Sequence, residues 1–152
     1  MKAILGFYVS DDYPNQLWGS GRTPIGTGVL SVSRDYGETW ENLSENINIQ
    51  FCCGIDSVIV PSEDENMVLA GFAASIKKSG DGGESWETVM NGFYVEAFLN
   101  SLSVPGRIYA TGILTGERRI FVAVSEDNGD TWEIREYHDS TLFGQFTRHS
   151  NA

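Results

Sequence analysis

The sequence predicts an all-β domain built from a threefold repeat, and two observations lead to this prediction. An eight-residue pattern, Ser-x-Asp-x-Gly-x-Thr/Ser-Trp, occurs three times, and its serines, Ser33, Ser79 and Ser125, lie 46 residues apart in both intervals. Recurrence at a fixed period indicates a repeat architecture. In addition, no stretch has a 3.6-residue apolar period over a helical length, whereas short β-rich runs bounded by Gly, Pro, Asn and Asp recur throughout.

Every defined position of the pattern has a local physical use. An Asp two residues before a Gly can fold its carboxylate onto backbone N–H groups of its own turn, and the Gly supplies a positive φ. The hydroxyl groups are suited to close the same turn, and the Trp is expected to begin the return strand and to turn inward as an anchor. The predicted structural turns consist of Ser33, Asp35, Gly37, Thr39 and Trp40, then Ser79, Asp81, Gly83, Ser85 and Trp86, then Ser125, Asp127, Gly129, Thr131 and Trp132.

The third copy also offers an alternative interpretation as a metal site. Asp127-Asn-Gly-Asp130 superficially resembles part of a calcium loop. The other two copies lack the extra oxygen ligands, and an EF-hand also requires a bidentate Glu downstream. We therefore expect a structural turn at this place and predict neither a metal nor a cofactor.

All three copies match the Asp box, also called the BNR repeat, so the chain resembles the Asp-box β-propellers of the sialidase-like superfamily. The resemblance extends over the whole chain as a period. It implies four-stranded antiparallel blades, with each box joining the third and fourth strands on the face away from the active site. The boxes would then be structural, and any functional residues would lie elsewhere.

The strand pattern suggests a half-propeller with blades at about 1–46, 47–92 and 93–138. Predicted strands of the second blade are 56–60, 67–72, 75–78 and 86–90, and those of the third are 100–104, 107–111, 119–124 and 132–136. The first repeat shows only three such runs, at 4–9, 28–32 and 40–43. A closing strand within about 139–152, centred on 141–147, has the character of the missing innermost strand.

This order predicts a homodimer, in which each chain lends its C-terminal strand to the first blade of its partner. A ring of three blades is below the four to eight that propellers use, and unpaired strand edges are avoided by soluble proteins. Two chains would give a six-bladed ring. The alternative is that the chain is a fragment of a longer propeller, although a random cut would rarely leave complementary ends.

A long predicted loop at 11–27 in the first blade is the main candidate for ligand contact. The sequence expectation places this loop on the face opposite the boxes. Trp18 offers two interpretations, since it can contact a ligand or pack under its own loop or in the dimer contact. Isolated acids of the other blades cannot be told from turn formers. The candidate ligand-binding residues are Asp11, Asp12, Tyr13, Trp18, Arg22, Asp56 and Glu96.

Composition restricts the partners and the compartment. The chain of 152 residues has a net charge of −11, which argues against nucleic acid or an anionic membrane as a partner. Cys52 and Cys53 are adjacent, and neighbours in a strand point to opposite faces, so free thiols in a reducing compartment are expected. The apolar start runs at once into Asp11 and Asp12 and lacks a cleavage site, so it is interpreted as a strand of a cytoplasmic protein.

Catalytic roles are not carried over from the resemblance. The aromatic-Arg-Ile-Pro signature of sialidases has its nearest match at Gly21-Arg22-Thr23-Pro24, which lacks the aromatic residue and lies close to the first box. The favoured function is a non-catalytic propeller that binds a glycan or another protein. The alternative is a small sialidase-like or endoglucanase-like glycoside hydrolase, or a remnant of one. A cluster of inner-strand carboxylates or arginines would distinguish the two, and the Ser, Val, Leu and Phe content of those strands predicts none.

Overall fold

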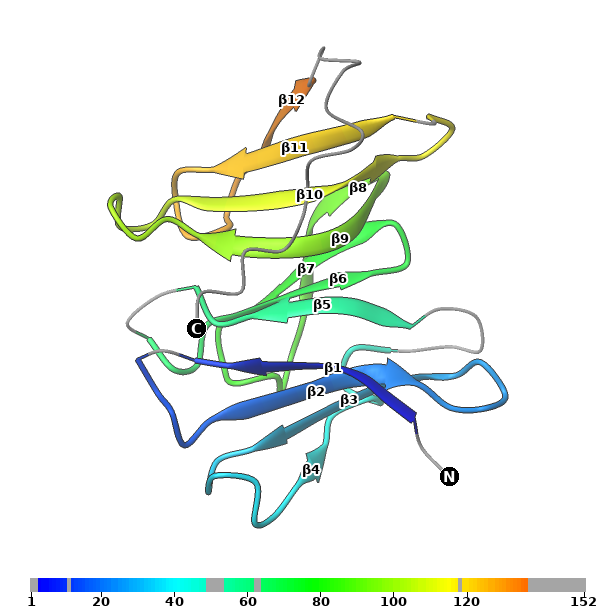
Figure 1. The fold of residues 1–152 in the computed structure, drawn as a ribbon, viewed down its shortest axis with the longest axis vertical. Helices are drawn as coiled ribbons and strands as arrows, with labels where there is room; N and C mark the ends of the chain where they lie inside the picture. Colours follow the sequence, from blue (N-terminus) through cyan, green and yellow to red (C-terminus); the bar gives the residue numbers. More distant parts are fainter. Residues whose placement is uncertain (1–2, 11, 49–53, 62–63, 118, 137–152) are drawn as a thin grey trace, which may run out of the picture.

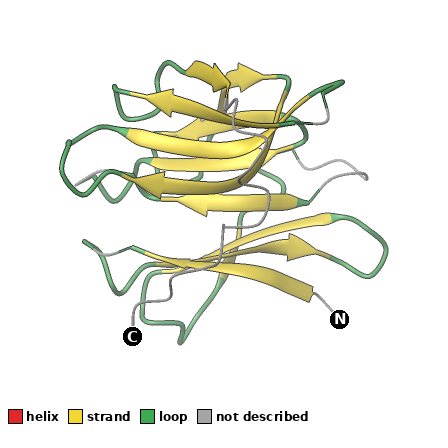
Figure 2. Ribbon diagram, turned by 45° about the horizontal axis from the view of Figure 1, so that its top comes forward, coloured by secondary structure: helices red, strands yellow, loops and turns green. Residues whose placement is uncertain are grey.

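The computed structural model describes residues 3–10, 12–48, 54–61, 64–117 and 119–136. Within these ranges twelve strands form three four-stranded antiparallel sheets, and no helix is present. Figure 1 shows the sheets following one another along the long axis, and Figure 2 shows that only loops and turns connect the strands. The predicted all-β class is confirmed, and each sheet has the form of a propeller blade.

Each sheet is a simple meander, in which strands that follow one another in sequence are neighbours. In each, the repeated turn joins the third strand to the fourth. The strands are β1 (Ala3–Val9), β2 (Leu17–Arg22), β3 (Gly28–Ser33) and β4 (Glu41–Asn42) in the first sheet, β5 (Ile55–Ile59), β6 (Val68–Phe72), β7 (Ser75–Ser79) and β8 (Glu87–Asn91) in the second, and β9 (Phe93–Asn100), β10 (Ile108–Leu114), β11 (Ile120–Ser125) and β12 (Glu133–Glu136) in the third.

The strands of the first sheet differ from those predicted from the sequence. The predicted loop at 11–27 contains β2, so β1 takes the innermost position that was expected to be empty. The sequence argument for strand exchange therefore fails, and its proposed closing strand lies outside the described residues. Gly19 and Gly21 hid β2 because glycine has a low strand propensity. Gly19 lies opposite Phe7 of β1, just as Ala70 lies opposite Val58 and Ala110 opposite Phe98, so this register position is small in all three sheets.

The innermost strand of the third sheet is also corrected. It was predicted at 100–104, but β9 runs from Phe93 to Asn100, and the next residues form a turn. Phe93, Val95 and Phe98 are its buried residues. An irregularity in the β9–β10 pairing shifts the alternation of buried and exposed residues between Val95 and Phe98. A search for strict alternation therefore misses this strand.

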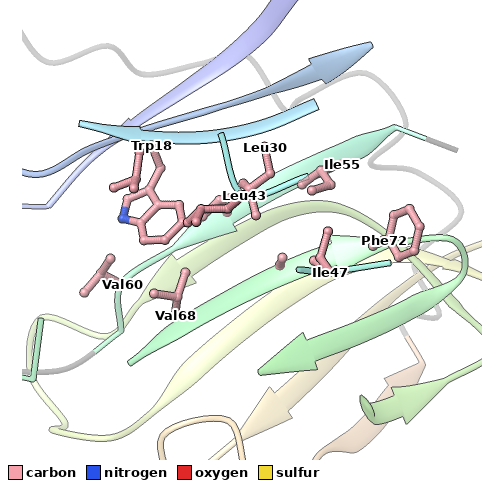
Figure 3. Close-up of a cluster of buried hydrophobic side chains, with 11 residues drawn as sticks. Trp18, Leu30, Leu43, Ile47, Ile55, Val60, Val68 and Phe72 are labelled. Atoms are coloured by element: carbon pink, nitrogen blue, oxygen red, sulfur yellow. The ribbon is translucent and has the colours of Figure 1, made fainter. Parts of the chain in front are cut away.

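Two apolar clusters lie between consecutive sheets. The first contains Trp18, Leu30 and Leu43 together with Val60 and Val68. Figure 3 shows the Trp18 ring pointing from β2 into the space between the first two sheets, toward Val60 and Val68. Only 1% of Trp18 is exposed, and its Nε1 donates to Gln16 Oε1 at 3.1 Å. The sheets are therefore held face to face by burial of apolar surface, with the indole N–H satisfied.

The three repeated turns have the same hydrogen bonds. In the second turn, the Ser79 hydroxyl donates to the Asp81 carboxylate at 2.8 Å, while the Gly83 amide donates to the Ser79 hydroxyl, also at 2.8 Å. The Ser85 amide and hydroxyl both donate to the Asp81 carboxylate, and Trp86 Nε1 donates to the Gly83 carbonyl. The groups that donate to the Asp81 carboxylate, led by the Ser85 hydroxyl, lower the pKa of Asp81 from 3.8 to about 2.

Candidate functional site

The innermost strands share a backbone irregularity at one register position. The pairing shifts between Ile4 and Gly6 in β1 and between Ile55 and Ser57 in β5, and β9 has the corresponding shift opposite Thr111 and Gly112. The residue without a partner at the shift is Leu5, Asp56 or Glu96, respectively. A β-bulge changes the direction of a side chain and is frequent near active sites. Two of these three positions carry a carboxylate.

Arg22 forms an ion pair with Asp56, and Glu96 lies near enough for its charge to act on Asp56. Arg22 Nη2 lies 3.5 Å from Asp56 Oδ1, and both side chains are partly exposed. Burial raises the pKa of Asp56, and the negative charge of Glu96 raises it further, whereas the positive charge of Arg22 lowers it. Three of the predicted ligand-binding residues are thus brought together. The expectation that the innermost strands lack such carboxylates is wrong, because Glu96 lies on β9, which was predicted at 100–104, and Asp56 lies on β5.

The hollow next to this cluster is small. A pocket of about 220 Å³ lies between the innermost strands, lined by Asp56 with Gly6, Ser20 and Ser57 and by aromatic side chains. Pockets for organic ligands commonly measure about 300–1,000 Å³. Asp56 therefore lines a hollow that is smaller than the usual pocket for an organic ligand, and neither Arg22 nor Glu96 is among its lining residues.

A larger pocket of about 760 Å³ lies at the other end of the innermost strands, among the connections that join first and second strands. β1, β5 and β9 all run toward this end, to the left in Figure 1, and the repeated turns lie at the same end. All three sheets contribute to the pocket. Its lining includes Tyr8 and Asp12 from the first sheet, Pro61, Asp64 and Met67 from the second, and Leu102, Pro105 and Arg107 from the third.

The charged side chains that line this pocket are Asp12, Asp64 and Arg107. Arg107 Nε donates to Glu126 Oε2 at 2.7 Å, and this carboxylate raises the pKa of Arg107. Asp12 is exposed at the rim, and Leu102 is 98% exposed. The Tyr8 hydroxyl donates to the Val60 carbonyl at 3.1 Å, which fixes the wall of the pocket. The pocket thus offers the Asp12 and Asp64 carboxylates and an apolar surface, while its guanidinium is already paired.

The residues of the predicted loop at 11–27 separate in the structure. Asp11 lies outside the described residues, Asp12 lines the larger pocket, and Tyr13 is half-buried against the first apolar cluster. Trp18 is buried in the core between the first two sheets, so it neither lies exposed to a ligand nor packs under its own loop or in a dimer contact. The prediction that the whole segment at 11–27 lies on the face opposite the repeated turns is also wrong. Because β2 divides the segment, Asp12 and Tyr13 lie at the end of the repeated turns and Arg22 lies at the opposite end.

The described part of the chain contains no group of three or more His, Cys, Asp or Glu side chains that could hold a metal ion. No helix there is long and apolar enough to cross a membrane.

Comparison with solved structures decides the fold. An ancestral GH74 enzyme superimposes with a TM-score of 0.70 at 16% identity over 88% of this chain, and the GH74 xyloglucanase from Xanthomonas campestris does so with 0.60 at 20% over 86%. YCF48 bound to a D1 peptide gives 0.58 at 20% over 88%. The chain folds as part of a β-propeller. No protein-family model and no curated protein matches the sequence.

The matched region is a small part of each of these structures. The chain covers 18% of the ancestral GH74 enzyme, 23% of the xyloglucanase and 39% of the YCF48 chain. At such low identity the likeness concerns the fold alone. The neighbours include both enzymes and a propeller with a bound peptide, so the side chains of this chain must decide between a catalytic and a binding function.

Proposed function

We propose that this chain is a non-catalytic binding module, an Asp-box β-propeller that holds an extended segment of another protein. The observation that carries the proposal is the pocket of about 760 Å³ at the end of the repeated turns, to which all three sheets contribute. Its volume lies within the range of ligand sites. The YCF48 propeller that resembles this chain carries a peptide, which supports a peptide as the class of ligand.

The side chains of the pocket favour a segment with a basic residue next to an apolar one. Asp12 offers an exposed carboxylate, whereas Arg107 is neutralised by Glu126. Leu102 offers an apolar contact. A net charge of −11 attracts cationic partners over a distance and repels acidic ones. On the adjacent Cys52 and Cys53 alone, we place the module in the cytoplasm.

The proposal is tested with two fluorescent peptides of equal length, one alternating Lys and Leu and the other alternating Glu and Leu. We expect fluorescence anisotropy to show binding of the first peptide only, with an affinity that falls as salt is added. Asp12→Asn should weaken binding about two- to fivefold, as for an exposed charge pair. Leu102→Ser should weaken it as well.

Two matched variants serve as controls. Glu38→Gln removes an exposed carboxylate of the first repeated turn, and Ile25→Ser removes an apolar side chain that is 85% exposed at the opposite end. Neither residue lines the pocket, so both variants should bind as the wild type does. Equal binding of the two peptides, or equal loss in the pocket variants and the controls, would contradict the proposal.

A glycoside hydrolase is the second candidate, on the observation that Asp56 has a raised pKa beside Glu96. Glycosidases use two carboxyl groups, one of which is protonated to act as the acid. The xyloglucanase neighbour makes xyloglucan the substrate to try. Under the binding proposal, no reducing ends form above the background of Asp56→Asn. Hydrolysis that both Asp56→Asn and Glu96→Gln abolish would favour the enzyme instead.

A further inference from the structure

The packing between consecutive sheets follows one rule in this chain. A residue of the second strand in one sheet lies against the turn glycine of the next sheet. A Cβ built on Gly83 would lie 3.1 Å from Trp18, and a Cβ built on Gly129 would lie 2.7 Å from Leu69. Trp18, Leu69 and Tyr109 occupy the same register position of β2, β6 and β10, opposite Tyr8, Ile59 and Leu99. Tyr109 is thus the third member of this series.

The outward side of the first sheet is built like the contact surfaces of the second and third. Phe7, Val58 and Phe98 share one register position. Phe98 lies 6.2 Å from Trp132, and Phe7 makes the equivalent contact with Trp40 at 5.9 Å between ring centroids. Val58 and Phe98 are buried against the preceding sheet, whereas Phe7 is 63% exposed. We call the surface formed by Phe7, Val9, Tyr36 and Trp40 the leading face.

Gly37 completes the comparison. It is the turn glycine of the first sheet, equivalent to Gly83 and Gly129, and a Cβ built on it would meet nothing within 4 Å in the described structure. At the other end of the chain, Leu99 and Ile120 are exposed and Tyr109 is half-buried. We call the surface formed by Leu99, Tyr109 and Ile120 the trailing face. The trailing face has the second-strand residue, Tyr109, and the leading face has the turn glycine, Gly37. In the described structure neither lies against its counterpart.

We propose that the trailing face of one copy packs on the leading face of a second copy, with Tyr109 resting on Gly37. The contact continues an interface that the chain already forms twice within itself. It joins two different faces, and two copies form it twice around a two-fold axis. The resulting ring has six blades, within the four to eight of closed propellers. No strand is exchanged, because each blade is complete within its own chain.

The molecular mass in solution is the first test. Sedimentation equilibrium of the wild-type chain should give twice the chain mass of 16.8 kDa. Phe7→Glu on the leading face and Tyr109→Glu on the trailing face should each raise the dissociation constant at least about thirtyfold, since each buries an unpaired charge at the centre of a contact. Ile25→Glu, on the turn between β2 and β3 and on neither face, should leave the dimer intact.

Mixing the two variants tests that the contact joins unlike faces. A Phe7→Glu chain has an intact trailing face and a Tyr109→Glu chain an intact leading face, so together they should form one of the two contacts and pair when neither pairs alone. Far-UV circular dichroism checks that both variants fold. A wild-type chain of single mass, a species larger than two chains, a dimer that survives Phe7→Glu, or a mixture that does not pair would each overturn the proposal.

Discussion

The repeated turns and the bulges of the innermost strands are both threefold features of the backbone, but only the turns keep the same side chains. Asp35, Asp81 and Asp127 make the same hydrogen bonds in all three sheets. The bulge position is Leu5, Asp56 or Glu96. The hydrogen bonds of the turn require a particular kind of side chain at each position, whereas a bulge constrains only the backbone. The repeat thus builds the framework, and the side chains at the bulges differ between sheets.

The largest expected effect concerns the core on which the second turn rests. Trp18→Ala should lower the free energy of unfolding by about 3–5 kcal/mol, since it removes a fully buried indole that packs against Gly83. Urea denaturation measures this change. Ile25→Ala, at an exposed turn, should stay within about 0.5 kcal/mol of the wild type. A small effect of Trp18→Ala would mean that the sheets are not held together by this cluster.

The turn glycines separate backbone strain from packing. Gly83 and Gly37 have φ values of 95° and 92°, but a Cβ on Gly83 would lie 2.7 Å from Leu43 whereas a Cβ on Gly37 meets open space. Gly37→Ala should cost about 1–2 kcal/mol from the left-handed backbone alone. Gly83→Ala should cost about 2–4 kcal/mol, since repacking is added.

Both glycine variants are best compared by thermal unfolding in a Phe7→Glu background, in which the proposed dimer contact would be broken. Equal costs for the two substitutions would mean that the second turn does not press on the first sheet. A difference that is present in this background and vanishes in the wild-type chain would indicate that Gly37 is covered there as Gly83 is.

The turns and the bulges should respond to pH with opposite signs. Hydrogen bonds from Thr39, Ser85 and Thr131 hold the pKa of Asp35, Asp81 and Asp127 at about 2, below the ordinary 3.8. Their contribution is fully present above the ordinary value and is lost as the pH falls from about 4 toward 2. The pKa of Asp56 is raised in the folded protein. The stability that its protonated form contributes is therefore present at low pH and is lost as the pH rises through that pKa.

Denaturation at a series of pH values measures these contributions. Asp81→Asn should flatten the acid side of the stability curve. Asp56→Asn should leave the acid side in place and remove a loss that occurs at higher pH. If Asp81→Asn left the slope between pH 2 and 4 unchanged, the turn carboxylates would not be the groups that titrate with unfolding.

The smallest effect is a change in titration without a change of fold. Arg22→Met should raise the pKa of Asp56, because it removes the positive charge that lowers this pKa, and Glu96→Gln should lower it, because it removes a negative charge. Carbon-detected NMR of the Asp56 carboxyl group measures both shifts. Shifts of the same sign in the two variants would mean that the three side chains do not form one cluster.

The sequence predicted the blades best where its periodicity is regular. All four strands of the second sheet were predicted within one or two residues, since Val68–Phe72 and Ser75–Ser79 are bounded by clear turn residues. The first and third sheets were mistaken where a local device breaks the pattern. Glycines hid β2, and a bulge shifted the alternation in β9. Both features belong to the pairing with the next strand of the same sheet, which a single strand does not reveal.

The candidate site was likewise predicted only in part. Arg22, Asp56 and Glu96 were recognised as candidates one by one, but nothing in their spacing indicates that they meet, because they come from β2, β5 and β9 of three sheets. The larger pocket was missed except for Asp12, since its other walls are ordinary turn residues such as Pro61 and Leu102. Turn residues such as these form a site only when the tertiary structure brings several of them together.

The sequence by itself determined the fold class, the number of repeats and the chemistry of the repeated turns. These depend on contacts within a few residues, so a short pattern contains the whole cause. The tertiary structure alone decided that the first blade is complete, that Trp18 belongs to the core, and that Asp12 and Arg22 lie at opposite ends of the strands. Those outcomes depend on which sheet packs on which, and residues distant in sequence settle them together.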